Sequence, residues 1–418
     1  MRRSARLLCS TMVAIGAVAT ARAAEQIEKT TLFIAGEEGY KLYRIPGLVA
    51  TSRGTLLAYC EARKSDRGDW GPIDILMRRS TDGGKTWLPR RHVAHHGPRV
   101  PKNPVALAQK LAKEDDQTVN NPVAIADADG TVHFLYCVEY ARCFYQRSDD
   151  DGETWTKPID ITPAFEEFRP EYLWKVIATG PGHGIQLHDN KGHAGRLVVA
   201  IWMSTGMGGH AHRPSVTATI HSDDRGRTWR RGEIAVPNNE EFVNPNETSL
   251  VELGDGRVLL NVRSESKANR RLLTASPDGA SGWSPPKFNA DLLEPVCMGS
   301  MARLDPQPPS HRRGLLFANP NTLDPIPGKA AAPGANRARK NLSVKLSYDD
   351  GETWPVARLL EDGLSGYSDL AVGPDGVIYC FYEAASTGQS HYATGRLVLA
   401  RFDLESLRTI PTTKVDPK

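Results

Sequence analysis

Short apolar runs that begin with a glycine recur along the chain. Their leucine, β-branched and aromatic residues form the pattern of buried strands. The leading glycines are 58 to 76 residues apart: Gly54, Gly130, Gly195, Gly256, Gly314 and Gly376. Self-similarity at such a period is typical of a repeat architecture, so the sequence predicts six copies of one structural unit.

A second pattern, S-x-D-x-G-x-T-W, follows an alternating or β-rich run each time. It fits Ser80–Trp87, Ser148–Trp155, Ser222–Trp229 and Ser347–Trp354, and Ser276–Trp283 is a degenerate copy. The aspartate can accept backbone N–H bonds in a tight loop, and the glycine supplies an unusual φ. The tryptophan is large enough to wedge between neighbouring sheets. These Asp boxes therefore predict structural turns.

Another short strand and a polar turn precede each glycine. These first strands are expected at Ile45–Thr51, Pro122–Ala126, Gly184–Leu187, Thr248–Leu253, Gly299–Leu304 and Asp369–Val372. With one strand before and one after each Asp box, a unit has four antiparallel strands, which describes a propeller blade. We therefore predict an all-β fold, a six-bladed β-propeller with Asp-box repeats, over residues 24–418. A short helix at Pro104–Lys113 and a long loop at Leu323–Arg339 complete the expectation.

The first residues have the pattern of a targeting segment. Arg2, Arg3 and Arg6 precede the apolar run Leu7–Val18, and Ala21-Arg22-Ala23 fits a cleavage site. Residues 1–23 are therefore predicted to be a signal peptide, with export to the periplasm or beyond the cell. The apolar run is short for a bilayer span, and no later stretch is apolar enough, so no membrane span is expected.

The charge and the cysteines narrow the class of protein further. The net charge of +3 falls to about −1 when the four arginines of the predicted signal are removed. A nucleic-acid partner, which needs a basic patch, is not expected. Cys137 and Cys143 could pair, whereas Cys60 and Cys380 lie in apolar runs and are interpreted as buried thiols. No Cys or His spacing indicates a metal site.

The strand order makes a prediction about faces. The start of strand 1, the end of strand 2 and the start of strand 3 share one face of a blade, and the Asp boxes lie on the opposite face. The polar residues expected on the first face are Arg44, Glu61, Asp69, Asn121, Glu247, Arg263, Arg339, Tyr367 and Glu383. Arg63 and Arg303, in comparable neighbourhoods, are interpreted as structural.

Each of these residues alone is more often a rim or salt-bridge residue, but equivalent positions in different blades converge near the ring axis. Three arginines gathered at the axis repel one another, so they need an anion. Guanidinium groups suit a carboxylate held by paired hydrogen bonds. The sequence therefore predicts a site for an acidic ligand.

Several motifs occur in a fixed order from about Tyr43 to Phe402. They are Tyr43-Arg44-Ile45-Pro46, the Asp boxes, GPGHGIQL at Gly180–Leu187, Asn246-Glu247 with Val251-Glu252-Leu253, Arg339-x-x-Leu342-x-Val344, and Tyr367-Ser368-Asp369-Leu370. With this ordered set the chain resembles the bacterial exo-α-sialidases (neuraminidases), retaining glycoside hydrolases of the six-bladed type. The resemblance implies action on terminal sialic acids of glycans and glycoconjugates, with no cofactor or metal required.

The resemblance also implies roles for individual residues. Arg44, Arg263 and Arg339 form the triad that binds the sialic acid carboxylate, and Glu383 holds Arg44 in place. Tyr367 is the nucleophile, Glu247 its general base, and Asp69 the acid/base. In the same loop Asp66 and Asp74 are alternatives, and Asp69 is preferred for its distance along the chain from Arg44 and from the first Asp box.

Three other functions remain as alternatives. A non-catalytic sialic-acid-binding propeller keeps the arginines but can lose Tyr367, Glu247 or Asp69, and all three positions are filled here. A hydrolase of a related ulosonic acid (KDN-type) differs only in its pocket for the C5 substituent, and a trans-sialidase differs in how an acceptor competes with water. The inserted region His92–Gln117 is predicted to shape the aglycone side. His183 is expected on the functional face without an assigned role.

Overall fold

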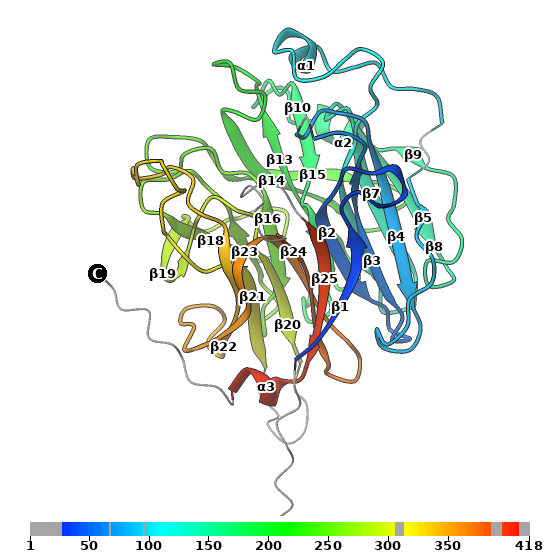
Figure 1. Ribbon diagram of the computed structural model, residues 1–418, viewed down its shortest axis with the longest axis vertical. Helices are drawn as coiled ribbons and strands as arrows, with labels where there is room; N and C mark the ends of the chain where they lie inside the picture. The colour runs from blue at the N-terminus through cyan, green and yellow to red at the C-terminus, as the bar shows by residue number, and fades with distance from the viewer. Residues whose placement is uncertain (1–26, 67, 95–96, 306–312, 386–394, 409–418) are drawn as a thin grey trace, which may run out of the picture.

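The structure is a computed structural model that describes residues 27–66, 68–94, 97–305, 313–385 and 395–408. The predicted signal peptide lies outside these residues, so it and export stay predictions. Helices are short: α1 (Pro104–Ala108), α2 (Pro163–Glu166), α3 (Leu404–Arg408) and the 3-10 turn η1 (Glu37–Gly39). Figure 1 places α1 and α3 at opposite ends of the molecule. No helix among the described residues is long and apolar enough to cross a membrane.

The strands of the described residues form five sheets, and the first four follow the chain in order except that β10 (Val176–Thr179) of the third sheet precedes β11 (Gly182–His183) of the second. The first sheet has β2 (Leu42–Ala50), β3 (Leu56–Arg63), β4 (Ile73–Ser80) and β5 (Arg91–His92). The second has β6 (Val119–Ala126), β7 (Val132–Val138), β8 (Arg142–Ser148), β9 (Ile159–Asp160) and β11 (Gly182–His183). The third has β10 (Val176–Thr179), β12 (Ile185–Gln186), β13 (Leu197–Ser204), β14 (Ser215–Ser222) and β15 (Arg230–Val236). The fourth has β16 (Thr248–Glu252), β17 (Val258–Val262), β18 (Arg270–Ser276) and β19 (Lys287–Leu293).

The fifth sheet has seven strands in the order β1-β25-β24-β23-β22-β21-β20. Their bounds are β20 (Ser300–Leu304), β21 (Gly314–Pro320), β22 (Lys340–Ser347), β23 (Val356–Val372), β24 (Ile378–Ala384), β25 (Arg396–Phe402) and β1 (Glu28–Ile34). The 17-residue β23 pairs with β22 along its first part and with β24 along its second. It is therefore the last strand of one four-stranded unit and the first of the next.

The sheets are arranged as in a propeller (Figure 1), so the predicted all-β propeller class is confirmed. The number of blades, six by the sequence repeat, stays a prediction. The ring is closed by the N-terminal strand: β1 pairs antiparallel with β25, and Figure 1 shows the two side by side. The first and last described strands thus complete one sheet together.

The Asp boxes form nearly identical hydrogen-bonded turns. In the first box, Asp82 Oδ1 accepts the Thr86 N–H at 2.9 Å, and Oδ2 accepts the Thr86 hydroxyl at 2.6 Å. The Gly84 N–H donates to Ser80 Oγ at 2.9 Å. The same bonds recur at Asp150, Asp224 and Asp349. The predicted structural role of these boxes is confirmed.

The register of the first sheet places the boxes away from the site residues. Arg44 lies opposite Glu61, near the start of β2 and the end of β3. Ser80, which opens the first box, lies opposite Leu56 at the other end of β3. The predicted separation of Asp boxes and candidate site onto opposite faces is therefore confirmed for this sheet.

The third unit differs from the expectation of one first strand at Gly184–Leu187. Only the two-residue β12 forms there, and β10 supplies most of the pairing with β13. Between them, Gly182 and His183 pair in parallel with β6 of the second sheet. The detour is possible because Gly180 and Gly182 have positive φ (26° and 103°), which side chains disfavour, and Pro181 offers no N–H to a ladder.

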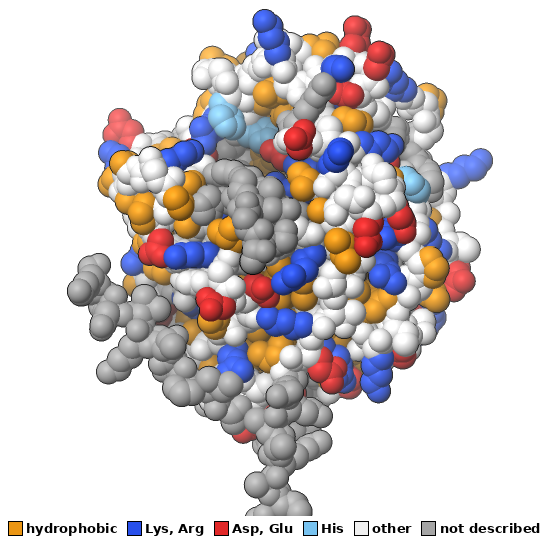
Figure 2. Space-filling model, viewed as in Figure 1, with side chains coloured by type: hydrophobic (Ala, Val, Ile, Leu, Met, Phe, Trp, Pro, Cys, Tyr) orange, Lys and Arg blue, Asp and Glu red, His pale blue; other side chains and the backbone are white. Residues whose placement is uncertain are grey.

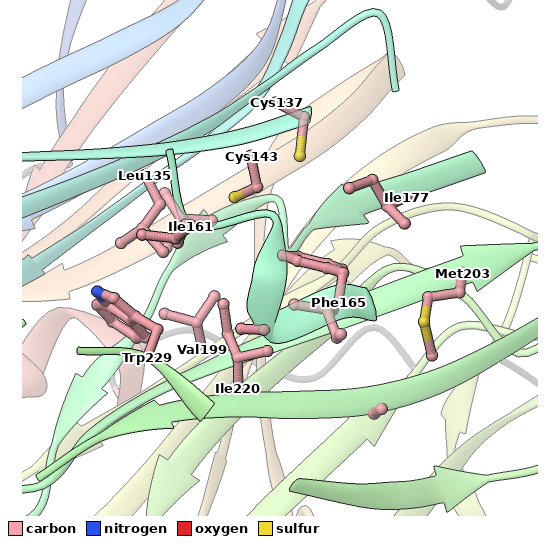
Figure 3. Close-up of a cluster of buried hydrophobic side chains, with 14 of the residues drawn as sticks. Leu135, Cys137, Cys143, Ile161, Phe165, Ile177, Val199, Met203, Ile220 and Trp229 are labelled. Atoms are coloured by element: carbon pink, nitrogen blue, oxygen red, sulfur yellow. The ribbon is translucent and has the colours of Figure 1, made fainter. Parts of the chain in front are cut away.

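The apolar core lies between neighbouring sheets. One large cluster joins strands of the second and third sheets with α2, and Figure 3 shows Phe165, Leu135 and Trp229 within it. Trp229 closes an Asp box and is 7% exposed, which agrees with the predicted wedge. Cys137 and Cys143 lie directly opposite on β7 and β8, and both are buried free thiols, so the pairing considered from sequence does not form.

The irregular regions largely match what the sequence predicts. The expected helix at Pro104–Lys113 is real but ends at Ala108. Asn103 begins it, because its side-chain oxygen accepts the Val105 N–H at 2.9 Å. The segment 323–339 contains no strand and only an isolated bridge between Pro325 and Arg337.

Candidate functional site

A pocket of about 240 Å³, here called the axial pocket, opens at the face opposite the Asp boxes. Six of the seven sequence-predicted site residues line it: Arg44, Asp69, Glu247, Arg263, Arg339 and Tyr367. These residues come from the first, fourth and fifth sheets and from the loops beside them. Figure 2 shows acidic, basic and histidine side chains around a hollow on one face of the molecule.

Tyr367 and Glu247 are in direct contact. The Tyr367 hydroxyl donates to Glu247 at 2.6 Å (Oε1) and 2.7 Å (Oε2). Arg263 Nη1 donates to the Tyr367 oxygen at 2.8 Å and pairs with Glu247 Oε2. Burial raises the pKa of Tyr367 well above its usual value of 10.0, and the charge of Arg263 opposes this rise. The resting phenol is therefore protonated and hydrogen-bonded to Glu247.

Arg44 is bound by Glu383. Arg44 Nε and Nη2 donate to the two oxygens of Glu383 at 3.1 and 3.2 Å. The N–H of Ile45 also donates to Glu383, and Ile45 has φ of 57°, which is rare for a β-branched residue. Burial raises the pKa of Glu383, but Arg44 and the main-chain N–H groups of Ile45 and Tyr367 together lower it more, and the net pKa lies below 4.5. The pair therefore stays ionised.

Two of the arginines lie over the ring of Tyr367. The guanidinium carbon of Arg44 is 5.2 Å from the ring centroid, and that of Arg339 is 5.3 Å away. Arg339 Nη2 donates to the carbonyl of Val296 at 2.8 Å. The structure thus brings the three predicted arginines together around the tyrosine and leaves an electropositive pocket for an anion.

Asp69 lines the pocket and pairs with Arg63, whose Nη1 is 2.9 Å from Asp69 Oδ1. Arg63 also binds Glu61 at 2.6 Å. Arg63, interpreted from the sequence as structural, thus contacts Asp69, the candidate acid/base. Burial raises the pKa of Asp69, but the groups around it, Arg63 foremost, together lower it more, and the net pKa lies well below its usual range. The alternative Asp74 binds Tyr40 and is absent from the pocket lining described here.

The sequence patterns did not predict the residues of one wall of the pocket. Tyr140, Trp202 and His212 form it, and the His212 ring centroid is 5.1 Å from that of Tyr140 and 5.2 Å from that of Trp202. Burial lowers the pKa of His212 to about 4, so its ring is neutral at pH 7. Trp202 Nε1 and His212 Nε2 are buried and have no hydrogen-bond partner among the described residues. Trp202 is on β13, whereas Tyr140 and His212 are turn residues that no repeat or motif marks.

The inserted region lies behind this wall. Val105 and Ala106 of α1 pack in one apolar cluster with Trp70, Tyr140 and Trp202. Its predicted effect on the aglycone side stays a prediction. His183, expected on the functional face, does not line the axial pocket; it lies in a second cavity described below, because the detour at Gly182 carries it to the ring axis.

Fold and pocket together define the class: a propeller with Asp-box turns on one face and, on the other, an arginine-lined pocket around a tyrosine–carboxylate pair. The model of the BNR repeat-like domain matches residues 101–380. The chain belongs to the sialidase family.

Individual relatives agree with this placement. The chain is 31% identical over 363 residues to the sialidase of Micromonospora viridifaciens, a match that covers 84% of this chain and 51% of that protein. The chain is 30% identical to sialidase-2 of Rattus norvegicus, a match that covers 86% of this chain and 93% of that protein. Among solved structures, the Hadza microbial sialidase Hz136 has a TM-score of 0.66 at 27% identity, covering 89% of this chain and 68% of that one. The chain thus spans about half the length of the first relative.

Proposed function

We propose that the protein is an exo-α-sialidase that removes terminal sialic acids from glycans and glycoconjugates with retention of configuration. One observation carries the proposal: the Tyr367 hydroxyl, 2.6 Å from Glu247 and 2.8 Å from Arg263, lies at the centre of an arginine-lined pocket. The family membership supports the same activity. The substrate is the partner that this pocket is expected to bind.

The residue types suit the chemistry of a sialoside. Its anomeric carbon already bears a carboxylate, so a carboxylate nucleophile would be repelled. A phenol primed by a neighbouring glutamate avoids this repulsion, and sialidases are an exception to the two-carboxylate pattern of glycosidases. In the proposed complex, Arg44, Arg263 and Arg339 bind the substrate carboxylate and orient the sugar.

The proposed reaction has two displacements. First, Tyr367 Oη bonds to the anomeric carbon as Glu247 takes its proton, the glycosidic bond breaks, and Asp69 protonates the departing oxygen. Then water, losing a proton to Asp69, attacks the same carbon. The bond to Tyr367 breaks, and the phenol recovers its proton from Glu247. Two inversions give net retention.

The test of the proposal is release of a fluorescent aryl aglycone from an α-sialoside. We expect turnover by the wild type and its collapse in Tyr367→Phe. Tyr379→Phe is the matched control, because Tyr379 Oη binds Gly83 O at the Asp-box face, and it should retain activity. A wild type that binds sialic acid through Arg44 without turnover would establish the binding-module alternative. Turnover only of a substrate with another C5 substituent would establish the related ulosonic acid.

Asp69 needs a separate test, because its pairing with Arg63 favours the ionised form. An ionised carboxylate suits the second step directly, whereas the first step requires a proton on the departing oxygen. Asp69→Ala should therefore lose far more activity on a sialyl-lactose substrate than on an aryl sialoside with an acidic aglycone. Equal losses on both substrates would contradict the acid role.

A further inference from the structure

His183 lies at the inner end of a second cavity, here called the axial channel, of about 230 Å³. The channel is lined by strands β2, β16, β20 and β23, which come from several sheets, so it follows the ring axis. Leu48 and Ala371 are among its lining residues. His183 is therefore placed below the axial pocket, on the side toward the Asp boxes.

The His183 ring is held by a carboxylate. Nδ1 donates to Asp369 Oδ1 at 2.8 Å, and Asp369 is 1% exposed. The other oxygen, Oδ2, accepts the main-chain N–H of Leu48 at 2.8 Å. His183 is on β11 beside the second sheet, Leu48 is on β2 of the first, and Asp369 is on β23 of the fifth. One buried pair thus joins three sheets at the axis.

Asp369 is two residues from Tyr367, and the strand between them is irregular. The register of β23 against β24 shifts between Ser365 and Ser368, so Tyr367 is presented on a bulge, a device that re-aims a side chain. Ser368 Oγ anchors the bulge by donating to Ala318 O at 3.1 Å. The Asp369 carboxylate is the next anchor along the chain.

The position of His183 is itself fixed. Tyr59 Oη donates to Gly182 O at 2.6 Å and accepts the Ala124 N–H at 2.9 Å. A Cβ on Gly182 would approach Asp369 Oδ1 to 3.1 Å, so glycine is needed for the close approach.

We propose that the hydrogen-bonded pair of His183 and Asp369 is a clasp at the propeller axis that positions Tyr367 for catalysis. Its catalytic consequence rests on the proposed function. Both are positioning residues, since they act through the strand that carries Tyr367.

The clasp depends on protonation. Burial lowers the pKa of His183, but the charge of Asp369 and the main chain of Met301 raise it more, and the net pKa lies above 6.5. Only an imidazolium can donate to both acceptors. The other titratable groups around the pair are Tyr59 on β3 and Cys380 on β24, which both interact with Asp369.

Charged and titratable groups also line the remainder of the channel: Glu252 on β16, Arg303 on β20, Asp305 and His188. Arg303 pairs with Glu252 at 3.4 Å, with Asp305 at 2.6 Å and with Asp189 at 2.7 Å, so these carboxylates are engaged by an arginine rather than by His183. Asp369 is thus the partner that decides the charge of His183.

The experiment compares the pH dependence of kcat for the wild type and His183→Gln on an aryl sialoside. At pH 6 we expect His183→Gln to lose about tenfold in kcat. KM should stay within about twofold, because the three arginines are unchanged. As pH rises through the His183 pKa, the wild type loses its imidazolium, so the ratio of the two kcat values should fall toward one. A ratio independent of pH would overturn the proposal.

The matched control is His133→Gln. His133 is another buried histidine paired with an aspartate, Asp127 at 3.3 Å, but it lies in the second sheet away from Tyr367. This variant should lower the melting temperature without changing the shape of the kcat profile. An equal change of profile in both variants would also overturn the clasp.

A measurement that needs neither turnover nor a variant keeps the clasp testable by itself. Nitrogen NMR of the wild type should show one buried histidine, identified as His183 by its contact with Asp369, that is protonated at pH 6. A neutral ring there would refute the clasp. Absence of wild-type turnover with an imidazolium present would instead refute the proposed sialidase function alone.

Discussion

At the residue scale, the carboxylate of Glu383 accepts four hydrogen bonds. Two come from Arg44, and one each from the main-chain N–H groups of Ile45 and Tyr367. Glu383 therefore orients Arg44, a candidate substrate-binding residue, and also the backbone of Tyr367, the candidate nucleophile. Because Arg44 and Glu383 are 7% and 3% exposed, an unpaired partner would be a buried charge.

We expect Glu383→Gln to lower the free energy of unfolding at pH 7 by about 3–5 kcal/mol, since Arg44 loses its counter-charge. The pKa of Glu383 is lowered in the fold, so this contribution is present above pH 4.5 and is lost as the pH falls. Urea unfolding at pH 7 and pH 4 measures both effects. The surface pair Arg79–Glu153 is the control, and Glu153→Gln should cost less than about 1 kcal/mol. Equal costs for the two variants would contradict the argument.

His212 makes a second prediction about the effect of acid on stability. Its folded pKa of about 4 lies below the usual 6.5, so protons bind the unfolded chain first and stability falls as the pH drops from about 6.5 to 4. His212→Gln should therefore lose less stability than the wild type over this window. Chemical unfolding at pH 7 and pH 4.5 checks the difference, and parallel losses in both proteins would refute it.

At the element scale, the Asp box is a turn stabilised by one aspartate. Asp150 accepts the Ser148 hydroxyl as well as the N–H and the hydroxyl of Thr154. Its neighbour Asp149 makes a loose ion pair with Arg147, at 3.6 Å, and accepts the Thr131 hydroxyl at 3.5 Å. The two aspartates of one turn thus differ in what they hold.

We expect Asp150→Ala to lower the free energy of unfolding by about 1–3 kcal/mol, because several hydrogen bonds are lost. Asp149→Ala should change it by less than about 0.5 kcal/mol. The kcat/KM of both folded variants should equal that of the wild type, since the boxes and the axial pocket are on opposite faces. A selective loss of kcat/KM in Asp150→Ala would show that the box does more than close a turn.

Elements that obey the repeat could be predicted from the sequence, and those that break it could not. The Asp boxes and glycine-led strands are local patterns, so their turns and registers follow from a few residues. The placement of Arg44, Arg263 and Tyr367 followed because equivalent strand ends converge at the axis. Placement in space does not assign catalytic roles, which stay proposals.

The features that could not be predicted depend on contacts between residues that are far apart in the sequence. Trp202 and His212 meet Tyr140 through packing that no local pattern encodes. Arg63 looked structural because its pairing with Asp69 depends on the course of the loop between them. His183 lies at the ring axis rather than on the expected functional face, because Gly182 and His183 pair in parallel with β6, which no local pattern predicts.

At the scale of the whole molecule, closure of the ring depends on β1. Phe33 on this strand is fully buried and packs on Tyr43 of β2 and Phe381 of β24, with ring centroids 5.2 and 6.2 Å apart. It therefore joins the first sheet to the last. Since Glu383 of β24 binds Arg44 of β2, the same seam crosses the axial pocket.

Phe33→Ala should lower the free energy of unfolding by about 3–5 kcal/mol, the usual cost of deleting a buried aromatic ring. Amide hydrogen exchange should accelerate first in β1 and β25 and later in the second and third sheets, because the seam opens before the other interfaces. Thr31→Ala, an exposed change in the same strand, should leave exchange unaltered. Uniform acceleration across all sheets would contradict a weak seam.

The closing strand also constrains when the pocket can exist during synthesis. Arg44 emerges from the ribosome early, but its partner Glu383 lies on β24, and β25 must follow before β1 has a strand to pair with. A nascent chain that ends before these strands cannot assemble the arginine triad around Tyr367. The pocket for the proposed acidic sugar is therefore completed only after β24 and β25 have been made, when the strands of the other four sheets already exist.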